Sequence, residues 1–426
     1  MSRKRDILSP VGAATGLFLI SVLAVSCACL SVLGVKLSNA PVVPWEQLIP
    51  LGVYVAGVPM ALIWMRLIGW KGDAGLVGAV FLLCGMGLVV QFRMGSFAQG
   101  LAAPLALAPF PLGLAAFAAG VALMGRGRGV WLSGMGWLAY LAALAVLAAM
   151  LLLGRRYRGG MYMVGNTNPS EIVKPLLVFF LAAYLSRRQK AFSETQAGIP
   201  VPPFATLLGL VFLWGVPMLL TIALKDLGLM VLLNAILIVM LFAIARSTGY
   251  LAIGVAAVTA AGFGIRFLSA HAQARFDVWL NPFADPTGKG WQILQALSAM
   301  YSGGLWGAGM GAGVPQTVPI VTSDFVYAAL AEEVGLAGCG LLLMVYAVLF
   351  SRGFRAAGAA RTPFERLLCV GLTGSLAVQT ILNVAGVTKA LPMTGITLPL
   401  ISHGGSSLIT TLFVAGLVAG LSDRKG

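Results

Sequence analysis

Charged side chains are scarce in this sequence of 426 residues, and the candidates for chemistry gather in a few short segments. Asp285 stands within residues 275–292, where the spacing of proline and glycine predicts turns rather than a helix. Pro286 disfavours a helical backbone at Asp285, so we expect this carboxylate on a rigid turn. There it either makes an ordinary Asx-type hydrogen bond or serves a ligand.

A second group of candidates opens two apolar helices. Glu171 and Lys174 are three residues apart, which places both charges on one helix face, with Ser170 as the predicted N-cap. This pair either neutralises itself or holds a substrate. Asp226 begins another apolar run and is either a simple cap or a functional acid.

The amino-acid composition indicates which kind of secondary structure positions these side chains. The chain is 59% hydrophobic and 10% charged, with a mean hydropathy of +0.95, which excludes an ordinary water-soluble globule. The five cysteines all lie in apolar runs, so neither a disulfide framework nor a zinc site is expected. The sequence therefore predicts an all-α integral membrane protein.

About twelve runs are long and apolar enough to span a bilayer. They lie near residues 11–35, 48–68, 74–92, 103–124, 129–153, 171–186, 204–224, 227–245, 250–269, 325–351, 366–388 and 403–421. With both termini in the cytoplasm, most of the 28 basic residues fall on the cytoplasmic side. The net charge of +15 is thus explained by membrane topology, and we expect no nucleic-acid partner.

Three arginines, Arg155, Arg156 and Arg158, violate this charge rule because they fall in a predicted outside loop. They either reach lipid headgroups or meet an anionic substrate at the outer surface.

The large outside loop, residues 270–324, contains a second recognisable pattern. From Trp291 the apolar residues repeat as on a short amphipathic helix, and a glycine-rich stretch over 303–313 follows. Those glycines either let backbone approach a ligand or form a flexible lid. On one continuous helix Asp324, Glu332 and Glu333 would point in different directions, so Glu332 is expected to pair with a cation or a polar side chain of a neighbouring helix.

Taken in order, the motifs resemble those of the SEDS family, the RodA/FtsW-type peptidoglycan glycosyltransferases. The matching segments are NPSEIVK at 168–174, DLG at 226–228, DPTGKGWQ at 285–292, SDF through EEVG at 323–335, and LPMTG through SHGGSS at 391–407, with Gln379 and Asn383 before the last. The resemblance covers residues 74–421. It implies a ten-helix core within 74–426, preceded by a two-helix extension over 1–73.

What the resemblance implies is polymerisation of lipid II, an undecaprenyl-pyrophosphate disaccharide pentapeptide, into β-1,4 glycan at the outer face of the bacterial inner membrane. Asp285 matches the catalytic loop aspartate of the family and would act as general base in an inverting reaction. No cofactor is certain, although a divalent cation, Mg²⁺ or Mn²⁺, could neutralise the pyrophosphate. We expect substrate contacts from Glu171, Lys174, Arg158, Asp226, Arg275, Lys289, Gln292, Asp324, Asn383, Lys389, Thr394, Ser402 and Ser406.

Two other functions remain open at this point. One is a lipid II translocase, in which Glu332, Glu333, Asp226 and the proline-interrupted spans would form a path at the membrane midplane. The other is a catalytically silent scaffold for a class B penicillin-binding protein, the transpeptidase that the family meets as a partner.

Overall fold

The computed structural model describes residues 45–96, 108–125, 129–157, 160–162, 168–196, 199–200 and 202–423, with a few isolated positions before residue 45. The predicted span at 11–35 and the arginine at 158 fall largely or wholly outside these residues. The chain divides into two compact units, Met1–Arg126 with Val278–Gly353 and Asn383–Gly426, and Gly127–Asp277 with Phe354–Leu382. We call them unit 1 and unit 2.

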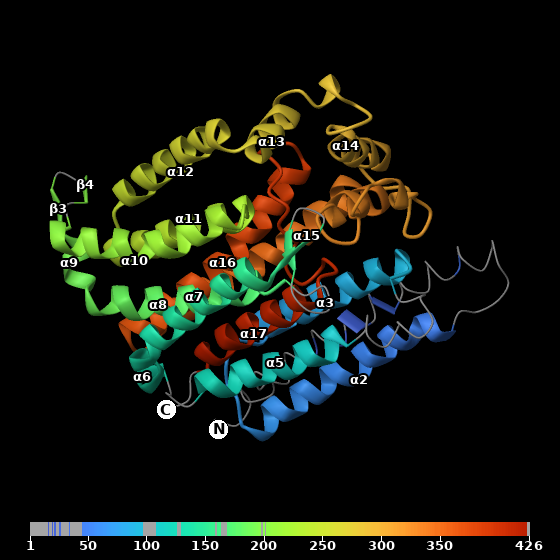
Figure 1. The fold of residues 1–426 in the computed structure, drawn as a ribbon. Helices are drawn as coiled ribbons and strands as arrows, with labels where there is room; N and C mark the ends of the chain where they lie inside the picture. Colours follow the sequence, from blue (N-terminus) through green and yellow to red (C-terminus); the bar gives the residue numbers. More distant parts are fainter. Residues whose placement is uncertain are drawn as a thin grey trace. The chain divides into compact units, whose positions relative to one another are not determined.

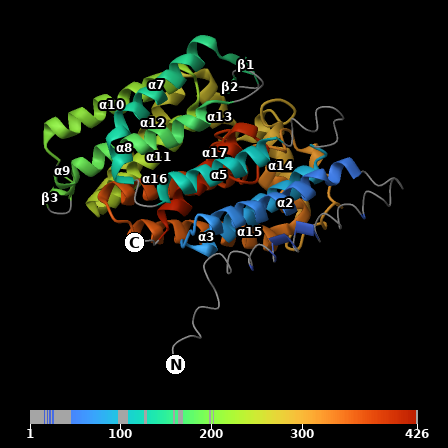
Figure 2. The same cartoon turned by 90° about the horizontal axis from the view of Figure 1, so that it is seen from below.

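Four helices of unit 1 lie side by side (Figure 1, Figure 2). They are α2 (Trp45–Leu67), α3 (Ala74–Arg93), α5 (Pro109–Met124) and α17 (Gly405–Leu421). Helices α5 and α17 approach closely at glycines, since a Cβ on Gly416 would lie 2.2 Å from the Phe117 carbonyl oxygen. Small residues at such contacts are typical of helix pairs in membranes, where close backbone packing replaces the hydrophobic effect.

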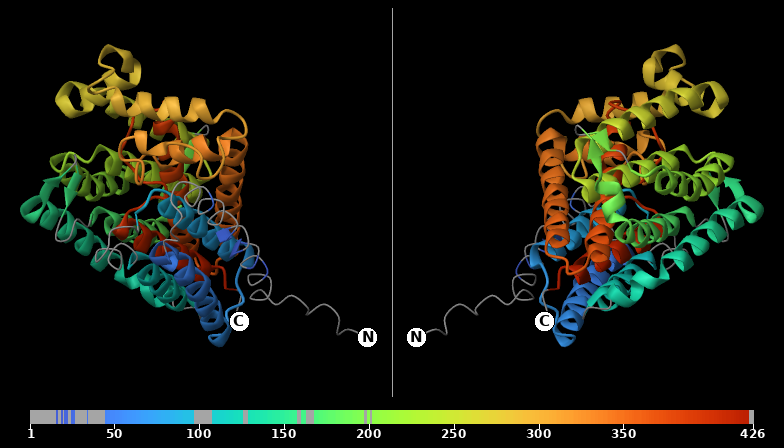
Figure 3. Two further views of the ribbon diagram at one scale, coloured as in Figure 1. Left: turned by 90° about the vertical axis from the view of Figure 1, so that its right-hand side faces the viewer. Right: turned by 90° about the vertical axis from the view of Figure 1, so that its left-hand side faces the viewer.

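Unit 1 also contains the large loop and a broken helix. The loop carries η5 (Pro282–Ala284), α14 (Trp291–Gly303) and η6 (Pro315–Thr317), and α15 (Val326–Gly358) follows. Figure 3 shows α14 crosswise to the long second part of α15. The amphipathic helix predicted from Trp291 is therefore confirmed.

Helix α15 is interrupted at Gly335, where φ is 66° and ψ is −175°. Four backbone hydrogen bonds join residues 304–309 to residues 332–337 and satisfy the groups that the break exposes. Gly303 and Gly307 permit this contact, because a Cβ on either would lie within 2.2 Å of a carbonyl oxygen of α15. These two glycines thus serve backbone packing.

The helices of unit 2 pack partly as sequence neighbours, α7 with α8, α10 with α11 and α11 with α12, and partly between non-neighbours, α8 with α11 and α7 with α10. Its helices are α6 (Gly129–Leu132), η3 (Ser133–Met135), α7 (Gly136–Leu153), α8 (Ser170–Arg187), α9 (Gln189–Ser193), α10 (Phe204–Ala223), α11 (Leu227–Ala245), α12 (Thr248–Leu268), the first part of α13 (Ala270–Leu280) and most of α16 (Pro363–Val387). Two short antiparallel ribbons join β1 (Arg155–Tyr157) to β2 (Gly160–Tyr162) and β3 (Thr195–Gln196) to β4 (Ile199–Pro200).

Within the part of the chain that the structure describes, six helices are long and apolar enough to cross a membrane, and four more contain shorter apolar stretches. The predicted all-α membrane fold is confirmed. The predicted boundary between residues 73 and 74 stays a prediction.

Two local predictions are wrong. Residues 275–280 belong to α13 rather than to turns, because Phe276 packs on Phe263 of the preceding helix with 5.6 Å between ring centroids. The pair of Asp277 with Arg266, at 3.1 Å, is exposed and contributes little. Ser170 is not the N-cap of α8, since the cap is Pro169 and no side chain caps it. Instead the Ser170 N–H donates to Asn168 Oδ1 at 3.1 Å.

Candidate functional site

Asp285 lies in an exposed turn of unit 1 between η5 and α14. Its two carboxylate oxygens accept the backbone N–H groups of Gly288 at 3.0 Å and Lys289 at 2.9 Å. A Cβ on Gly288 would lie 2.4 Å from the Asp285 carboxylate, which explains the glycine at that position. The turn therefore holds the carboxylate rigidly while leaving it open to solvent. The Asx-type hydrogen bond, one of the two alternatives predicted for Asp285, is therefore present. Each carboxylate oxygen still has a lone pair that can accept a hydrogen bond from a ligand.

Two of the predicted substrate contacts follow Asp285 closely in the sequence, and a third is hydrogen-bonded to the segment before it. Lys289 and Gln292 are exposed, next to this turn and in the first turn of α14. Lys389 has a left-handed backbone (φ 61°), and its carbonyl oxygen accepts the Trp279 indole N–H at 3.1 Å. This bond fixes the segment after α16 against the end of α13 inside unit 1.

A buried polar network in unit 1 contains several other predicted contacts. The Asn383 side-chain amide donates to the carbonyl oxygens of Asp324 at 2.9 Å and Ile396 at 2.7 Å. The Ser402 hydroxyl donates to the Ser323 carbonyl at 2.5 Å and accepts from the Leu398 N–H. These bonds are mainly to backbone, so the two side chains fix loops.

Two buried oxygens near this network have no hydrogen-bond partner among the described residues, Asn383 Oδ1 and Thr394 Oγ1. Because an unpaired buried oxygen is costly, these atoms are candidates to receive a ligand hydroxyl or amide. Ser406 lies in the first turn of α17 and is partly exposed.

The cation partner that was predicted for Glu332 belongs to Glu333 instead. Helix α15 begins only at Val326, so Asp324 precedes it and the angular comparison on one helix is wrong. Glu333 pairs with Arg93 Nε at 2.6 Å, and Arg93 also donates to the Gly313 carbonyl oxygen. Glu332 instead accepts the Val314 N–H at 2.8 Å.

Arg93 was not among the predicted site residues. It stands at the end of an apolar helix, and a charge in that position was the available signal.

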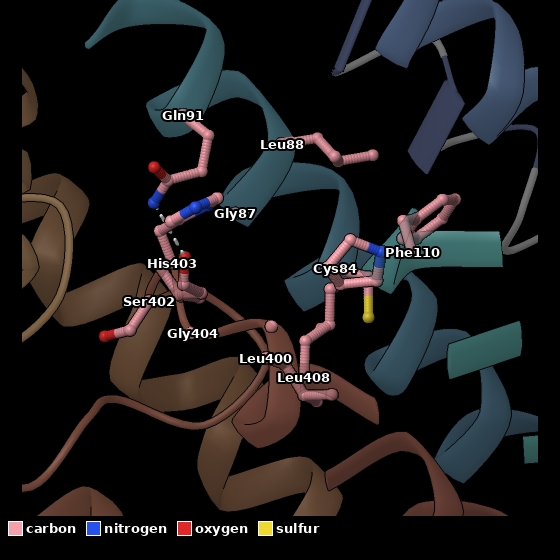
Figure 4. Close-up of a pocket in the computed structure, with 13 residues that line it drawn as sticks. Cys84, Gly87, Leu88, Gln91, Phe110, Leu400, Ser402, His403, Gly404 and Leu408 are labelled. Carbon is pink, nitrogen blue, oxygen red and sulfur yellow. Dashed lines mark hydrogen bonds between the residues drawn. The ribbon is translucent and has the colours of Figure 1, made fainter. Parts of the chain in front are cut away.

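A cavity of unit 1 adjoins the segment around His403 (Figure 4). It contains about 420 Å³ of empty space, part of it open to the outside. Its walls are mainly apolar, with Leu88, Phe110 and Leu408 among them, whereas Gln91 and His403 supply polar groups. Gln91 donates to the Thr322 and Ile401 carbonyl oxygens, and burial lowers the pKa of His403.

Unit 2 brings four of the predicted residues together. Lys174 Nζ lies 2.5 Å from Glu171 Oε2 and donates to Gln379 at 2.9 Å, with both charged side chains about nine-tenths buried. Asp226 caps α11 by accepting the Leu229 N–H at 2.9 Å, which is one of the two roles predicted for it. Burial raises the pKa of Asp226, and the charges of Lys174 and Arg275 oppose this shift. Glu171, Lys174, Asp226 and Arg275 thus form one charged cluster.

Two predictions about cations are not tested by the described residues. Arg158 lies outside them. Among the described side chains no group of three or more His, Cys, Asp and Glu residues gathers to hold a metal. Magnesium in phosphate sites often relies on one or two carboxylates plus the substrate's own oxygens, so the divalent cation stays a prediction.

The apolar helices define an integral membrane protein. Its exposed candidate for catalysis is Asp285, on the large loop of unit 1. Residues 114–425 match the FtsW/RodA/SpoVE cell cycle protein family, and the chain belongs to that family. This confirms the relationship that the motifs predicted.

Several proteins with assigned names are similar to this chain in sequence. The chain is 34% identical to the peptidoglycan glycosyltransferase RodA of Mycobacterium tuberculosis, over 68% of this chain and 63% of that protein. It is 35% identical to the stage V sporulation protein E of Bacillus subtilis, over 60% of this chain and 69% of that protein. The chain thus spans less than two thirds of the mycobacterial relative.

Solved structures agree with this assignment. A chain from a study of the structural coordination of polymerization and crosslinking by a peptidoglycan synthase complex has a TM-score of 0.64 at 28% identity, covering 82% of this chain and 96% of that one. The rod shape determining protein RodA of Thermus thermophilus has a TM-score of 0.57 at 27% identity, covering 83% and 98%. Family membership and apolar helices together make this a bacterial membrane protein.

Proposed function

We propose that this protein is a peptidoglycan glycosyltransferase that polymerises lipid II into β-1,4 glycan strands at the outer face of the cytoplasmic membrane. The observation that carries the proposal is Asp285, an exposed carboxylate held on a rigid turn within a family motif. Relatives named peptidoglycan glycosyltransferase support it.

The proposed chemistry requires a base and no protein nucleophile. The acceptor sugar hydroxyl loses a proton as it attacks the anomeric carbon of the donor, and Asp285 would accept that proton through its remaining lone pairs. Attack on the face opposite the leaving pyrophosphate inverts the α-linked donor in one step. The two N–H groups that hold Asp285 keep the carboxylate oriented during the transfer.

Positive charge is needed where the lipid pyrophosphate leaves. Lys289 follows Asp285 on the same exposed turn, and Lys389 lies in the same unit. Lys174, Arg275 and Arg158 are the other candidates, and a Mg²⁺ or Mn²⁺ ion carried by the pyrophosphate would add to them. The cavity beside His403 has mainly apolar walls and is partly open to the outside, so it is a candidate contact for a segment of the lipid carrier.

The test is glycan polymerisation by purified protein supplied with lipid II. Asp285→Asn keeps an oxygen for one backbone N–H but removes the base, and we expect the rate to fall by about 10²–10⁴-fold. Asp277→Asn is the matched control, since Asp277 is an exposed acid on the preceding helix. Normal polymerisation by Asp285→Asn would show that the base is assigned wrongly.

A lipid II translocase is the second candidate, and the break in α15 is the observation that favours it. Discontinuous helices with acids at the break mark transport paths in many carriers, and Glu332 lies three residues before Gly335. If the protein is a translocase, labelled lipid II should cross the vesicle membrane with the wild type and with Asp285→Asn, but not with Glu332→Gln. Polymerisation predicts no such movement.

A class B penicillin-binding protein is the proposed partner, supported by the structural likeness to a chain of a peptidoglycan synthase complex. A purely scaffolding role would leave the partner's stimulation intact in Asp285→Asn. The proposed orientation places both termini in the cytoplasm. A reporter enzyme active only outside the membrane, fused to the C-terminus, should therefore stay inactive.

A further inference from the structure

A second hollow lies in unit 2, where the start of α7 meets the end of α8. It contains about 260 Å³ of empty space, part of it open, and is lined by Ser133, Gly136, Trp137, Phe180, Ala183, Tyr184, Arg187 and Arg188. The two helices are close here because Gly136 faces Ala183, and a Cβ on Gly136 would lie 2.5 Å from that of Ala183. None of these residues takes part in the proposed transfer reaction.

Two exposed arginines stand at the rim of this hollow. The Arg187 guanidinium donates to the Ser133 carbonyl oxygen at 3.1 Å, which ties it to the start of α7. The Arg188 guanidinium lies 4.1 Å from the centre of the Tyr184 ring, an ordinary cation–π distance. Among the described residues neither guanidinium pairs with a carboxylate. Both are therefore held in place while most of their N–H donors remain available.

The wall below the arginines is aromatic and continues into an apolar helix face. Phe180 packs on Tyr140 with 4.4 Å between ring centroids, and Trp137 packs on Phe180 at 5.5 Å. Trp137 is 49% exposed, and Leu138 and Leu141 on the same helix are 59% and 60% exposed. An occupant thus meets fixed positive charge at one end and exposed hydrocarbon along the helix.

We propose that this hollow binds the headgroup of an anionic phospholipid. Arginine forks match phosphate oxygens, Trp and Tyr favour the membrane–water interface, and a basic pocket between spanning helices is suited to acidic lipid headgroups. The acyl chains would run along the exposed face of α7. The topology proposed above places this site in the cytoplasmic leaflet.

The direct test is native mass spectrometry of the full chain in detergent, titrated with phosphatidylglycerol or phosphatidylcholine of equal chain length. The wild type should bind at least one phosphatidylglycerol about tenfold more tightly than phosphatidylcholine, because only the former carries net negative charge. Arg187→Gln/Arg188→Gln should lose this preference. Arg355→Gln, which removes another exposed arginine of unit 2, should keep it.

Two further arms make the result decisive. Arg187→Lys/Arg188→Lys keeps the charge but removes the planar forks, so its preference should fall between those of wild type and the glutamine variant. Millimolar inorganic phosphate should not displace the lipid; displacement would assign the site to free phosphate instead. Equal binding of the two lipids by wild type, or an unchanged preference in the glutamine variant with an unaltered unfolding temperature, would overturn the proposal.

Discussion

The ion pair between Arg93 and Glu333 is expected to be one of the strongest single contacts in unit 1. The two side chains are 11% and 5% exposed, and 2.6 Å separates Arg93 Nε from Glu333 Oε1. At an effective dielectric constant of about 20, two unit charges at this distance attract by about 6 kcal/mol before desolvation is subtracted. The pair links the end of α3 to the broken region of α15 and, through Gly313, to the glycine-rich loop.

Arg93→Gln leaves the Glu333 carboxylate buried without a counter-charge, which should cost about 3–5 kcal/mol in the free energy of unfolding. The double variant Arg93→Gln/Glu333→Gln removes both charges and should cost no more than the single one. Glu333→Gln alone leaves Arg93 buried without a counter-charge and should cost at least about 2 kcal/mol. The double-mutant cycle should therefore give a coupling of at least about 2 kcal/mol. The measurement is unfolding in mixed micelles with increasing SDS, followed by tryptophan fluorescence.

The control for this cycle is Arg352, which pairs with Asp73 at 2.8 Å but with side chains 37% and 27% exposed. Arg352→Gln should cost about 1 kcal/mol or less, because water screens the pair. If the Arg93 and Glu333 variants were additive within about 0.5 kcal/mol, the reasoning from burial would be refuted.

Three further changes test other parts of the structure by the same unfolding measurement. Lys174→Met should cost about 3 kcal/mol by leaving Glu171 unpaired, and adding Glu171→Gln should recover part of it; no recovery would contradict the buried pair. Gly335→Ala should cost at least about 2 kcal/mol because φ is 66° and a Cβ would lie 2.3 Å from a backbone nitrogen, whereas Gly340→Ala, in open space on the same helix, should be near neutral. Burial lowers the pKa of His403, so the unfolded state binds a proton at higher pH than the folded state does, and the free energy of unfolding should fall as the pH drops below about 6.5. His403→Gln should make that fall smaller. Identical pH profiles for the variant and the wild type would contradict this role of His403.

The membrane character of this protein was determined by sequence alone. A chain that is 59% hydrophobic has too few polar groups for a water-soluble surface, and spanning helices satisfy their own backbone hydrogen bonds. Local chemistry also fixed the Asp226 cap, the face shared by Glu171 and Lys174, and the turn at Asp285. Each of these depends on residues no more than four positions apart.

Other features of the fold and of the candidate site depend on tertiary contacts, which the local sequence does not reveal. Arg93 and Glu333 are 240 positions apart, and nothing in either local sequence names the other. The break at Gly335 is stable only because residues 304–309 supply its hydrogen bonds, so a helix pattern read along 325–351 predicted one continuous span. Likewise, the turn-forming composition of 275–280 gave way to a helix once Phe276 could pack on Phe263. Propensity is worth only tenths of a kcal/mol per residue, so packing and charge pairing in the folded chain override it.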